Sequence, residues 1–261
     1  MNTTHYINQG INDGILTLEF NRVSKKNAIT QSMYQTLTDA LESAKQNVDI
    51  KVVIFQGNGG CFTAGNDLHD FLSQKEDSTH PPVKNNINKN SPVYQFLLSL
   101  RDFNKPLLAS VSGVAVGIGT TLLLHCDLVF ADRTAIFSMP FTQLGVCAEA
   151  GSSLLLPQQI GYHKAAEWLL LGEPHTAEEA LNDGLINAIV EDVNSHTCDM
   201  AMKLARLPTD GVMATRKLLK EYQMNNDQNS LHASIENEII EFTRLLELDD
   251  VKKRVNAFLN R

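Results

Sequence analysis

No stretch of this 261-residue chain approaches the roughly eighteen consecutive apolar residues that a membrane-spanning helix needs. The first residues lack the basic and then apolar pattern of a secretory signal, and the last carry no peroxisomal or lipid-attachment motif. Basic residues are outnumbered, 22 against 30 acidic ones, for a net charge of −8, which disfavours binding to nucleic acids and anionic membranes. We therefore expect a cytoplasmic protein that binds neither, and a phosphate-bearing ligand would need a local basic group.

Cysteine is scarce and scattered. The four cysteines form no C-x-x-C pair: Cys61, Cys126, Cys147 and Cys198. This spacing predicts buried free thiols and no metal site. The signature of a serine hydrolase is also missing, because no serine lies in a G-x-S-x-G turn. We interpret His125 as a core or helix-end histidine and His163 as a surface residue at a helix start.

What is present indicates an α/β fold. Apolar residues make up 43% of the chain, enough for one large domain or two modest ones. They recur at helical spacing from Ile29 to Ala44, and Thr30 stands where it can cap that helix. Short apolar runs predict strands at 15–20, 51–56, 107–111 and 128–130. Strands that alternate with helices favour a parallel sheet with right-handed crossovers.

Later segments differ from this pattern. Lys75–Pro92 has three prolines and few apolar residues, so we expect a long loop there. Thr176 and Glu179 have the spacing of a capping box, and Gly184 stands where that short helix would end. From about Asn194 the pattern is helical to the end of the chain, with no linker before it.

Two turns rich in small residues follow apolar runs, Cys61–Leu68 and Ser112–Gly119. Without large side chains in the way, their backbone N–H groups can approach a ligand closely. A dinucleotide site is disfavoured, because Leu122 stands where the third glycine of that motif belongs. A helix that starts at Gly119 would still favour nearby negative charge. We predict that the two turns together hold one negatively charged oxygen.

Glu149 is an acid among small and apolar neighbours, in the segment Val146–Ser153 followed by three leucines. Acids seldom occupy such surroundings without a role there. One interpretation is a carboxylate that caps or complements the N-terminus of the following helix. The other is a partly desolvated carboxylate with raised proton affinity, suited to general base chemistry. The residues alone leave both open.

Three motifs together resemble those of the crotonase (enoyl-CoA hydratase/isomerase) superfamily, over almost the whole chain. Phe62–Leu68 is similar to the F-x-A-G-x-D-L element of that superfamily. Pro106–Gly117 resembles its P-V-I-A-A-V-x-G-x-A-x-G element, and Leu128–Asp132 resembles the strand that follows. The resemblance implies an α/β crotonase-like fold, with a spiral ββα core over residues 1–195 that holds an acyl-CoA site. Residues 196–261 would form a C-terminal helical region that assembles the chain into homotrimers or hexamers.

The resemblance also implies a site. Its substrate would be an acyl-coenzyme A thioester, with no other cofactor and no metal. The backbone N–H groups of Ala64 and Ile118 would form an oxyanion hole for the thioester oxygen, and Glu149 would be the catalytic acid–base group. Contacts to coenzyme A would come from two segments: Lys25, Lys26, Ala28, Ala64, Gly65, Asn66, Asp67 and Leu68. The two lysines would supply the local positive charge, and Leu68 would flank the adenine.

Departures from the superfamily pattern narrow the implied reaction. Hydratases carry two glutamates at positions where this chain has Thr121 and Phe141. Residues 148–153 instead resemble the P-E-G-x-S-S element of peroxisomal-type enoyl-CoA isomerases, with Ala148 and Ala150 in place of its proline and glycine. The resemblance thus implies that a 3-enoyl-CoA becomes 2-trans-enoyl-CoA, a step of fatty-acid β-oxidation. Alternatives are an enoyl-CoA hydratase, another acyl-CoA enzyme of the superfamily, or a CoA-binding protein without turnover.

Overall fold

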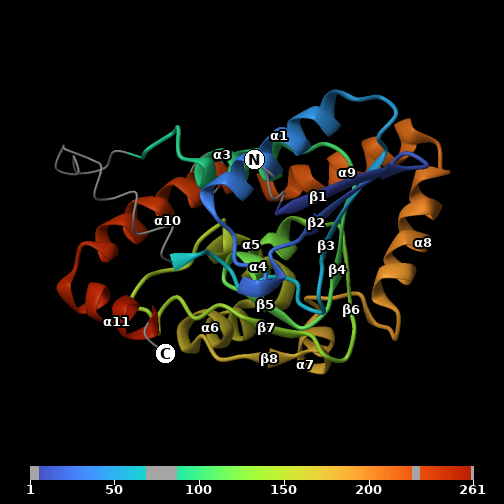
Figure 1. The fold of residues 1–261 in the computed structure, drawn as a ribbon. Helices are drawn as coiled ribbons and strands as arrows, with labels where there is room; N and C mark the ends of the chain where they lie inside the picture. Colours follow the sequence, from blue (N-terminus) through green and yellow to red (C-terminus); the bar gives the residue numbers. More distant parts are fainter. Residues whose placement is uncertain (1–5, 69–86, 225–229, 260–261) are drawn as a thin grey trace, which may run out of the picture.

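The computed structural model describes residues 6–68, 87–224 and 230–259. Its larger sheet has six strands in the order β1-β2-β3-β4-β6-β9 (Figure 1). Their bounds are β1 (Ile7–Asn12), β2 (Ile15–Phe20), β3 (Val52–Gly57), β4 (Leu107–Val111), β6 (Leu128–Ala131) and β9 (Ala188–Ile189). β1 pairs with β2 in the antiparallel sense, and the other neighbouring pairs are parallel. The four predicted strands are confirmed, with shifts of one residue at β3 and β6.

A smaller sheet of three strands lies beside the larger one. It contains β5 (Val114–Val116), β7 (Ile136–Ser138) and β8 (His175–Thr176). The chain passes from β4 to β5 and then into α4 (Ile118–Thr121), and from β6 to β7 and then into α5 (Ser152–Ile160). Each unit therefore places one strand in each sheet and a helix after them, which is the expected ββα arrangement.

The remaining helices include those predicted from Ile29 to Ala44, after Thr176 and from about Asn194, and also a helix from Pro92 that was not predicted. Their bounds are α1 (Gln31–Gln46), α3 (Pro92–Asp102), α6 (Tyr162–Leu171), α7 (Ala177–Asp183), α8 (Val193–Ala205), α9 (Thr209–Met224), α10 (Leu231–Leu246) and α11 (Asp249–Leu259). Two 3₁₀ turns are η1 (Val23–Lys25) and η2 (Leu122–His125). The Thr30 hydroxyl caps α1 by accepting from the Met33 N–H, and Thr176 and Glu179 form the predicted capping box of α7, which ends at Gly184. Local polar signals therefore fix these helix ends.

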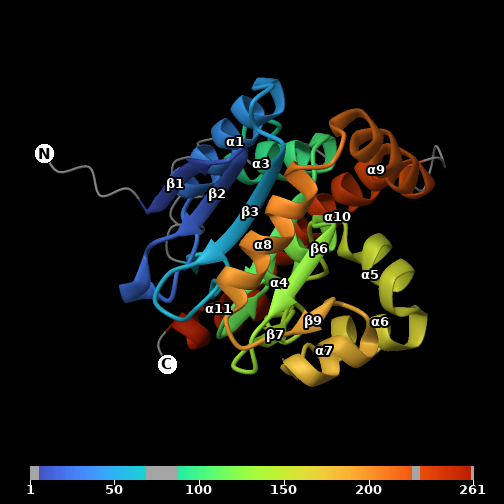
Figure 2. The ribbon, with the colours of Figure 1, turned by 90° about the vertical axis from the view of Figure 1, so that its right-hand side faces the viewer.

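Helices cover both faces of the larger sheet. α8 lies across one face (Figure 2), and a small core forms there between the strands and the helix. That core contains Ile15, Val52, Ile54, Leu108 and Phe130 of the strands, with Val193, Ala201 and Ala205 of α8. The opposite face carries the main core, into which α1, α3, α4 and α5 pack.

The C-terminal helices are not an independent layer. α10 packs on α3 and α5, and α11 follows it at the left of Figure 1. Leu231, Ile235 and Leu246 of α10, and Val251 of α11, belong to the main core. The helical C-terminal region is thus confirmed as secondary structure, and it shares its core with the ββα part. Its role in trimer assembly stays a prediction.

Some expectations are corrected. The helix predicted to start at Gly119 starts at Ile118 and lasts one turn before the chain tightens into η2. The four cysteines are free thiols, but only Cys126 is buried, and Cys198 is exposed. His125 is buried at the end of η2 and His163 is exposed at the start of α6, as predicted. Most of the predicted loop, residues 75–86, lies outside the described residues, and Pro92 begins α3.

Candidate functional site

The two predicted turns lie side by side. The Thr63 N–H donates to the Val114 carbonyl, and the Val116 N–H donates to the Thr63 carbonyl, each at 3.0 Å. Gly65 follows at φ +87°, and a Cβ there would lie 2.6 Å from the Val116 carbonyl oxygen. Glycine is required at this point, both for the left-handed backbone and for the close approach. The predicted pairing of the turns is therefore a feature of the structure.

Backbone N–H groups in the first turn differ in availability. The Ala64 N–H donates to the Lys26 carbonyl at 2.9 Å, and the Gly65 N–H donates to the Thr63 hydroxyl at 3.1 Å. By contrast, the Asn66 N–H has no acceptor among the described residues. The prediction that Ala64 supplies an oxyanion donor is therefore corrected, because its hydrogen is already used. The donor that the turn leaves open is two residues further on.

The second turn keeps its predicted donor. Ile118 is the first residue of α4, and within the described part of the chain its N–H has no acceptor, as expected at a helix start. The preceding Gly117 has φ +56°. Gly119 packs so closely on the first turn that a Cβ there would lie 2.7 Å from the Thr63 Cγ2 atom. The two open N–H groups, at positions 66 and 118, thus belong to turns in direct contact.

Asn66 is held in place from two sides. The Ile29 N–H donates to the Gly65 carbonyl at 2.8 Å, and the Asp67 N–H donates to the Ile29 carbonyl at 2.9 Å. The hydroxyl of the buried Tyr34, on α1, donates to the Asn66 side-chain oxygen. Burial, and the nearby charge of Glu149, raise the pKa of Tyr34 well above its usual value. Tyr34 therefore links the open N–H at position 66 to the neighbourhood of Glu149.

Glu149 is buried, with 9% of its surface exposed, and its Oε1 atom has no hydrogen-bond partner among the described residues. It lines a cavity of about 140 Å³. Apolar side chains of α3 and α10 form much of the rest of that cavity: Val93, Leu97, Ile239 and Phe242. Desolvation, with a smaller contribution from Glu238, raises the pKa of Glu149 to about 8. This carboxyl group therefore holds its proton far more tightly than an exposed glutamate.

The structure separates the two interpretations of Glu149. The N-cap of α5 is Gly151, and the Glu149 side chain makes no capping hydrogen bond to that helix. The capping acid is Glu238 of α10, which accepts from the Gly151 N–H at 2.6 Å and the Ser153 N–H at 2.9 Å. Glu149 therefore does not cap α5 by a hydrogen bond, and its surroundings are those of a desolvated carboxylate.

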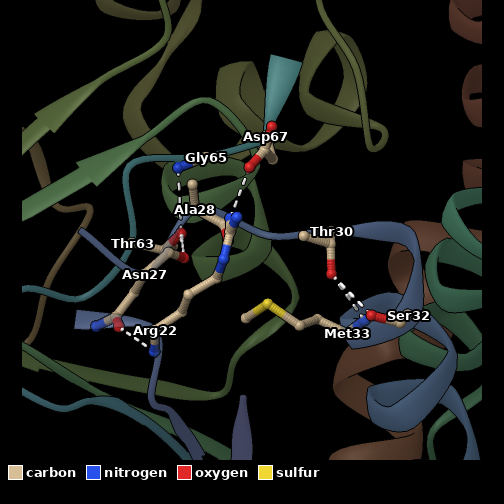
Figure 3. A network of polar contacts seen from close by, with 9 residues as sticks. All are labelled: Arg22, Asn27, Ala28, Thr30, Ser32, Met33, Thr63, Gly65 and Asp67. Atoms are coloured by element: carbon tan, nitrogen blue, oxygen red, sulfur yellow. Dashed lines mark hydrogen bonds and ion pairs between the residues drawn. The ribbon is translucent and has the colours of Figure 1, made fainter. Parts of the chain in front are cut away.

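A polar network holds the predicted coenzyme A segments together (Figure 3). The Arg22 guanidinium donates to the Asp67 carboxylate at 2.6 Å and to the Ala28 carbonyl at 3.1 Å. Asn27, fully buried at φ +57°, accepts from the Arg22 N–H, and its own carbonyl accepts from the Thr63 hydroxyl at 2.7 Å. These contacts engage the side chain of Asp67 and the carbonyl of Ala28 within the protein, where they fix the segment beside the first turn.

The predicted phosphate contacts lie at the edge of this network. Lys25 and Lys26 are exposed, and their ammonium groups have no ion-pair partner among the described residues. The hydrogen bond from the Ala64 N–H to the Lys26 carbonyl places them beside the first turn. Leu68 is partly buried against the main core. The structure thus brings the predicted coenzyme A residues to one region of the surface.

Three residues of the site, Tyr34, Arg22 and Glu238, were not predicted from the sequence. Tyr34 has the spacing of a core residue on α1, and nothing in the sequence marks its hydroxyl. Glu238 carried a signal, because it lies three positions after Ile235 on the apolar side of α10. An acid at such a position is buried, so it needs partners.

The described part of the chain has neither a membrane-spanning helix nor a cluster of metal-binding side chains. No helix there combines the length and the hydropathy needed to cross a membrane. No three histidine, cysteine, aspartate or glutamate side chains within it gather closely enough to hold a metal ion.

Fold and site together define an α/β protein in which two open main-chain donors accompany a desolvated carboxylate. The model of the enoyl-CoA hydratase/isomerase family matches residues 10–261, and the chain therefore belongs to this family of the crotonase superfamily. It is 38% identical to enoyl-CoA delta isomerase 2 of Rattus norvegicus over 228 residues. The aligned part covers 86% of this chain and 56% of the rat protein. The chain is 31% identical to 2,3-dehydroadipyl-CoA hydratase of Escherichia coli, over 95% of this chain and 92% of that protein.

Solved structures agree with this assignment. The Pseudomonas aeruginosa protein OdaA superimposes with a TM-score of 0.89 at 39% identity, over 99% of this chain and 100% of that one. An enoyl-CoA hydratase/isomerase from Pseudoalteromonas atlantica superimposes with a TM-score of 0.87 at 33% identity, over 98% of this chain and 97% of that one. This chain spans about half the length of the rat isomerase. Because the relatives include an isomerase and a hydratase, the comparisons show the family and leave the reaction open.

Proposed function

We propose that the protein isomerises 3-enoyl-CoA thioesters to 2-trans-enoyl-CoA, with Glu149 as its single acid–base group. The observation that carries the proposal is the unpartnered, buried oxygen of Glu149 in a mainly apolar cavity. A carboxylate in such a place is poised to accept a proton from carbon. The rat delta isomerase relative supports the same reaction class.

The reaction needs stabilisation of negative charge on the thioester oxygen. Removal of a proton from the α-carbon of a 3-enoyl thioester gives a dienolate, whose charge rests largely on that oxygen. The open N–H groups of Asn66 and Ile118 are the donors proposed to hold it. Each such donor contributes about 3 kcal/mol to a transition state of this kind.

Glu149 would then move one proton between two carbons. Its carboxylate takes the α-proton and becomes a carboxylic acid, and the electron pair shifts towards the γ-carbon. The same acid returns the proton at the γ-carbon, which leaves the double bond conjugated with the thioester. The raised pKa of about 8 suits this cycle, because the group must both take and give the proton near neutral pH.

Within the part of the chain that the structure describes, no second acid is available beside Glu149, which favours isomerisation over hydration. Addition of water requires a base for the water and an acid for the α-carbon. The hydratase positions carry Thr121 and Phe141, neither of which transfers protons in this range. Glu238 is close, but both of its oxygens accept hydrogen bonds from backbone N–H groups at the start of α5. Of these two carboxylates, the one that remains open is Glu149.

Coenzyme A would lie along the network of Figure 3. Exposed Lys25 and Lys26 would meet its phosphates, and Leu68 would flank the adenine. We further propose that the chain works as a homotrimer or hexamer in the β-oxidation of unsaturated acyl chains, and that it needs no cofactor or metal beyond the thioester.

The test compares two substrates. With 3-hexenoyl-CoA we expect formation of the conjugated enoyl thioester, and with crotonyl-CoA we expect little hydration, each followed by absorbance and product chromatography. Glu149→Gln should lower the isomerisation rate by about 10²–10⁴-fold while acyl-CoA binding persists. Glu178→Gln, at an exposed acid, is the matched control and should leave the rate unchanged. Hydration without isomerisation would identify a hydratase, and inertness with tight binding would identify a binding protein.

A further inference from the structure

We infer that Glu238 is a positioning residue for Glu149: it occupies the amides at the start of α5 and so leaves the Glu149 carboxylate unpartnered beside the substrate. This inference rests on the proposed function for its catalytic meaning. Its structural part concerns two carboxylates from distant parts of the chain, one before α5 and one in the middle of α10.

Glu238 is almost fully buried and thoroughly engaged. One of its oxygens accepts from the Gly151 N–H at 2.6 Å. The other accepts from the Ser153 N–H at 2.9 Å and from the Ser153 hydroxyl at 2.5 Å. The Ser153 hydroxyl lies 3.1 Å from that of Ser234, which is also on α10. Burial raises the pKa of Glu238 above its ordinary value, and the three donors that point at its carboxylate oppose that shift.

The turn that carries Glu149 is clamped between two elements. On one side, Gly151 at φ +75° approaches α10 so closely that a Cβ there would lie 2.3 Å from the Leu231 Cδ1 atom. On the other side, the ring nitrogen Nε2 of His125 lies 2.8 Å from the Ala150 carbonyl oxygen. Ala150 itself has φ +61°, an uncommon backbone conformation for a residue with a side chain. The direction of Glu149 is therefore imposed by η2 and α10.

The helix start beside Glu149 would otherwise lower its proton affinity. Free N–H groups at a helix N-terminus stabilise a nearby anion. Here the two N–H groups of residues 151 and 153 are already donated to Glu238. Glu149 consequently gains no hydrogen bond from them, and its Oε1 atom stays open.

The carboxyl group of Glu238 also raises the proton affinity of Glu149. The neighbours of Glu149 with titratable groups are Glu238 of α10, Tyr34 of α1 and Cys147 of its own segment. Burial and nearby carboxylates raise the pKa of Tyr34 and of Cys147, so both are neutral near pH 7. Burial is the main cause of the raised pKa of Glu149, and Glu238 adds to it. Glu238 is thus the neighbouring carboxyl group that adds to the effect of burial on the proton affinity of Glu149.

Glu238→Gln tests this with minimal change in shape. The variant keeps an oxygen to accept from the turn and removes the negative charge. We expect the acidic limb of the pH profile of kcat/KM for isomerisation to move down by about 1 pH unit, as loss of a buried like charge predicts. Glu238→Asp keeps the charge and should stay near the wild-type limb. The inference would be overturned if folded Glu238→Gln had the same acidic limb in its kcat/KM profile as the wild type. It would also be overturned if the acidic limb of Glu238→Asp shifted as far as that of Glu238→Gln.

A second readout needs no substrate. Protein labelled with ¹³C at the glutamate carboxyl carbon is titrated by NMR, and the Glu149 signal is identified by its loss in Glu149→Gln. Glu238→Gln should lower the pKa of that signal, whether or not the protein isomerises 3-enoyl-CoA. If Glu238→Gln lowers the pKa of Glu149 but the wild-type protein does not isomerise 3-enoyl-CoA, the inference is supported and the proposed function is refuted. If the wild-type protein is active but Glu238→Gln leaves the pKa of Glu149 unchanged, the proposed function is supported and the inference is refuted.

Discussion

Burial without a hydrogen-bond partner distinguishes Glu149 from the other acids described in this chain. A glutamate in water loses its proton near pH 4.5, whereas desolvation raises the pKa of Glu149 to about 8. Near pH 7 most molecules therefore carry this carboxyl group in its protonated form. The residue is therefore tuned towards proton return as well as proton removal.

This tuning predicts the pH dependence of the reaction. The base works in its ionised form and burial favours the protonated form, so activity is lost as pH falls. We expect kcat/KM for a 3-enoyl-CoA to rise with pH through about 8 and then level off. Initial rates at saturating and limiting substrate between about pH 5 and 10 check this. A profile that is flat down to about pH 5 would show a carboxylate of ordinary acidity.

Residue roles were only partly predictable from the sequence. Glu149 could be singled out from its small and apolar neighbours, whereas Ile118 was predicted as a donor from the resemblance to the crotonase superfamily. The oxyanion donor in the first turn could not be chosen from the sequence. Ala64 and Asn66 both carry a backbone N–H group, and the direction of each group is visible only in the structure. The direction of the Ala64 N–H depends on its hydrogen bond to the carbonyl of Lys26, a residue more than thirty positions away in the sequence.

Elements with local signals were well predicted. Thr30 and the Thr176 capping box mark helix starts within four residues, so their positions follow from the sequence. α4 was less predictable, because its one turn and the 3₁₀ segment after it depend on packing against Thr63. The role of α10 was hidden as well, since Glu238 meets its partners 85 and 87 positions away.

The segment before α1 is held by Arg22, so we expect substitution of this residue to lower the stability of the fold. Arg22 joins it to the first turn through the Asp67 carboxylate and the Ala28 carbonyl, and both ends of the ion pair are largely buried. We expect Arg22→Met to lower the free energy of unfolding by about 1–3 kcal/mol, as loss of charged hydrogen bonds does. It should also raise KM for acyl-CoA, because the turn loses its support.

Urea denaturation of Arg22→Met beside Arg133→Met is the measurement. Arg133 pairs with Glu178 at 2.8 Å, yet their side chains are 80% and 51% exposed. Such a surface pair contributes under about 1 kcal/mol. Equal losses of stability in the two variants would show that the network of Figure 3 does not hold the segment in place.

Over the whole molecule, the charge of −8 opposes the binding of a polyanionic ligand. Lys25 and Lys26 offset this locally, since both are exposed and adjacent. We expect Lys25→Glu/Lys26→Glu to raise KM for acyl-CoA about tenfold or more at low salt, with the difference shrinking as salt screens the charges. The kcat should change little, because neither lysine lies at the reacting carbons.

A truncated substrate and a distant lysine serve as controls for this charge effect. An acyl-pantetheine thioester lacks the nucleotide phosphates, so its KM should be almost the same in wild type and double variant. Lys203→Glu, on α8 across the sheet, should leave both KM values unchanged. An equal rise in KM for both thioesters would place the lysines away from the phosphates.

The central claim is that one carboxyl group carries a proton from the α-carbon to the γ-carbon. The most direct measurement supplies 3-hexenoyl-CoA with deuterium at the α-carbon and locates the label in the product by mass spectrometry and NMR. We predict that part of the deuterium appears at the γ-carbon in the wild-type protein and that Glu149→Gln gives almost no product. Product formed at the normal rate by Glu149→Gln, or a γ-carbon that takes its hydrogen entirely from solvent, would contradict the account.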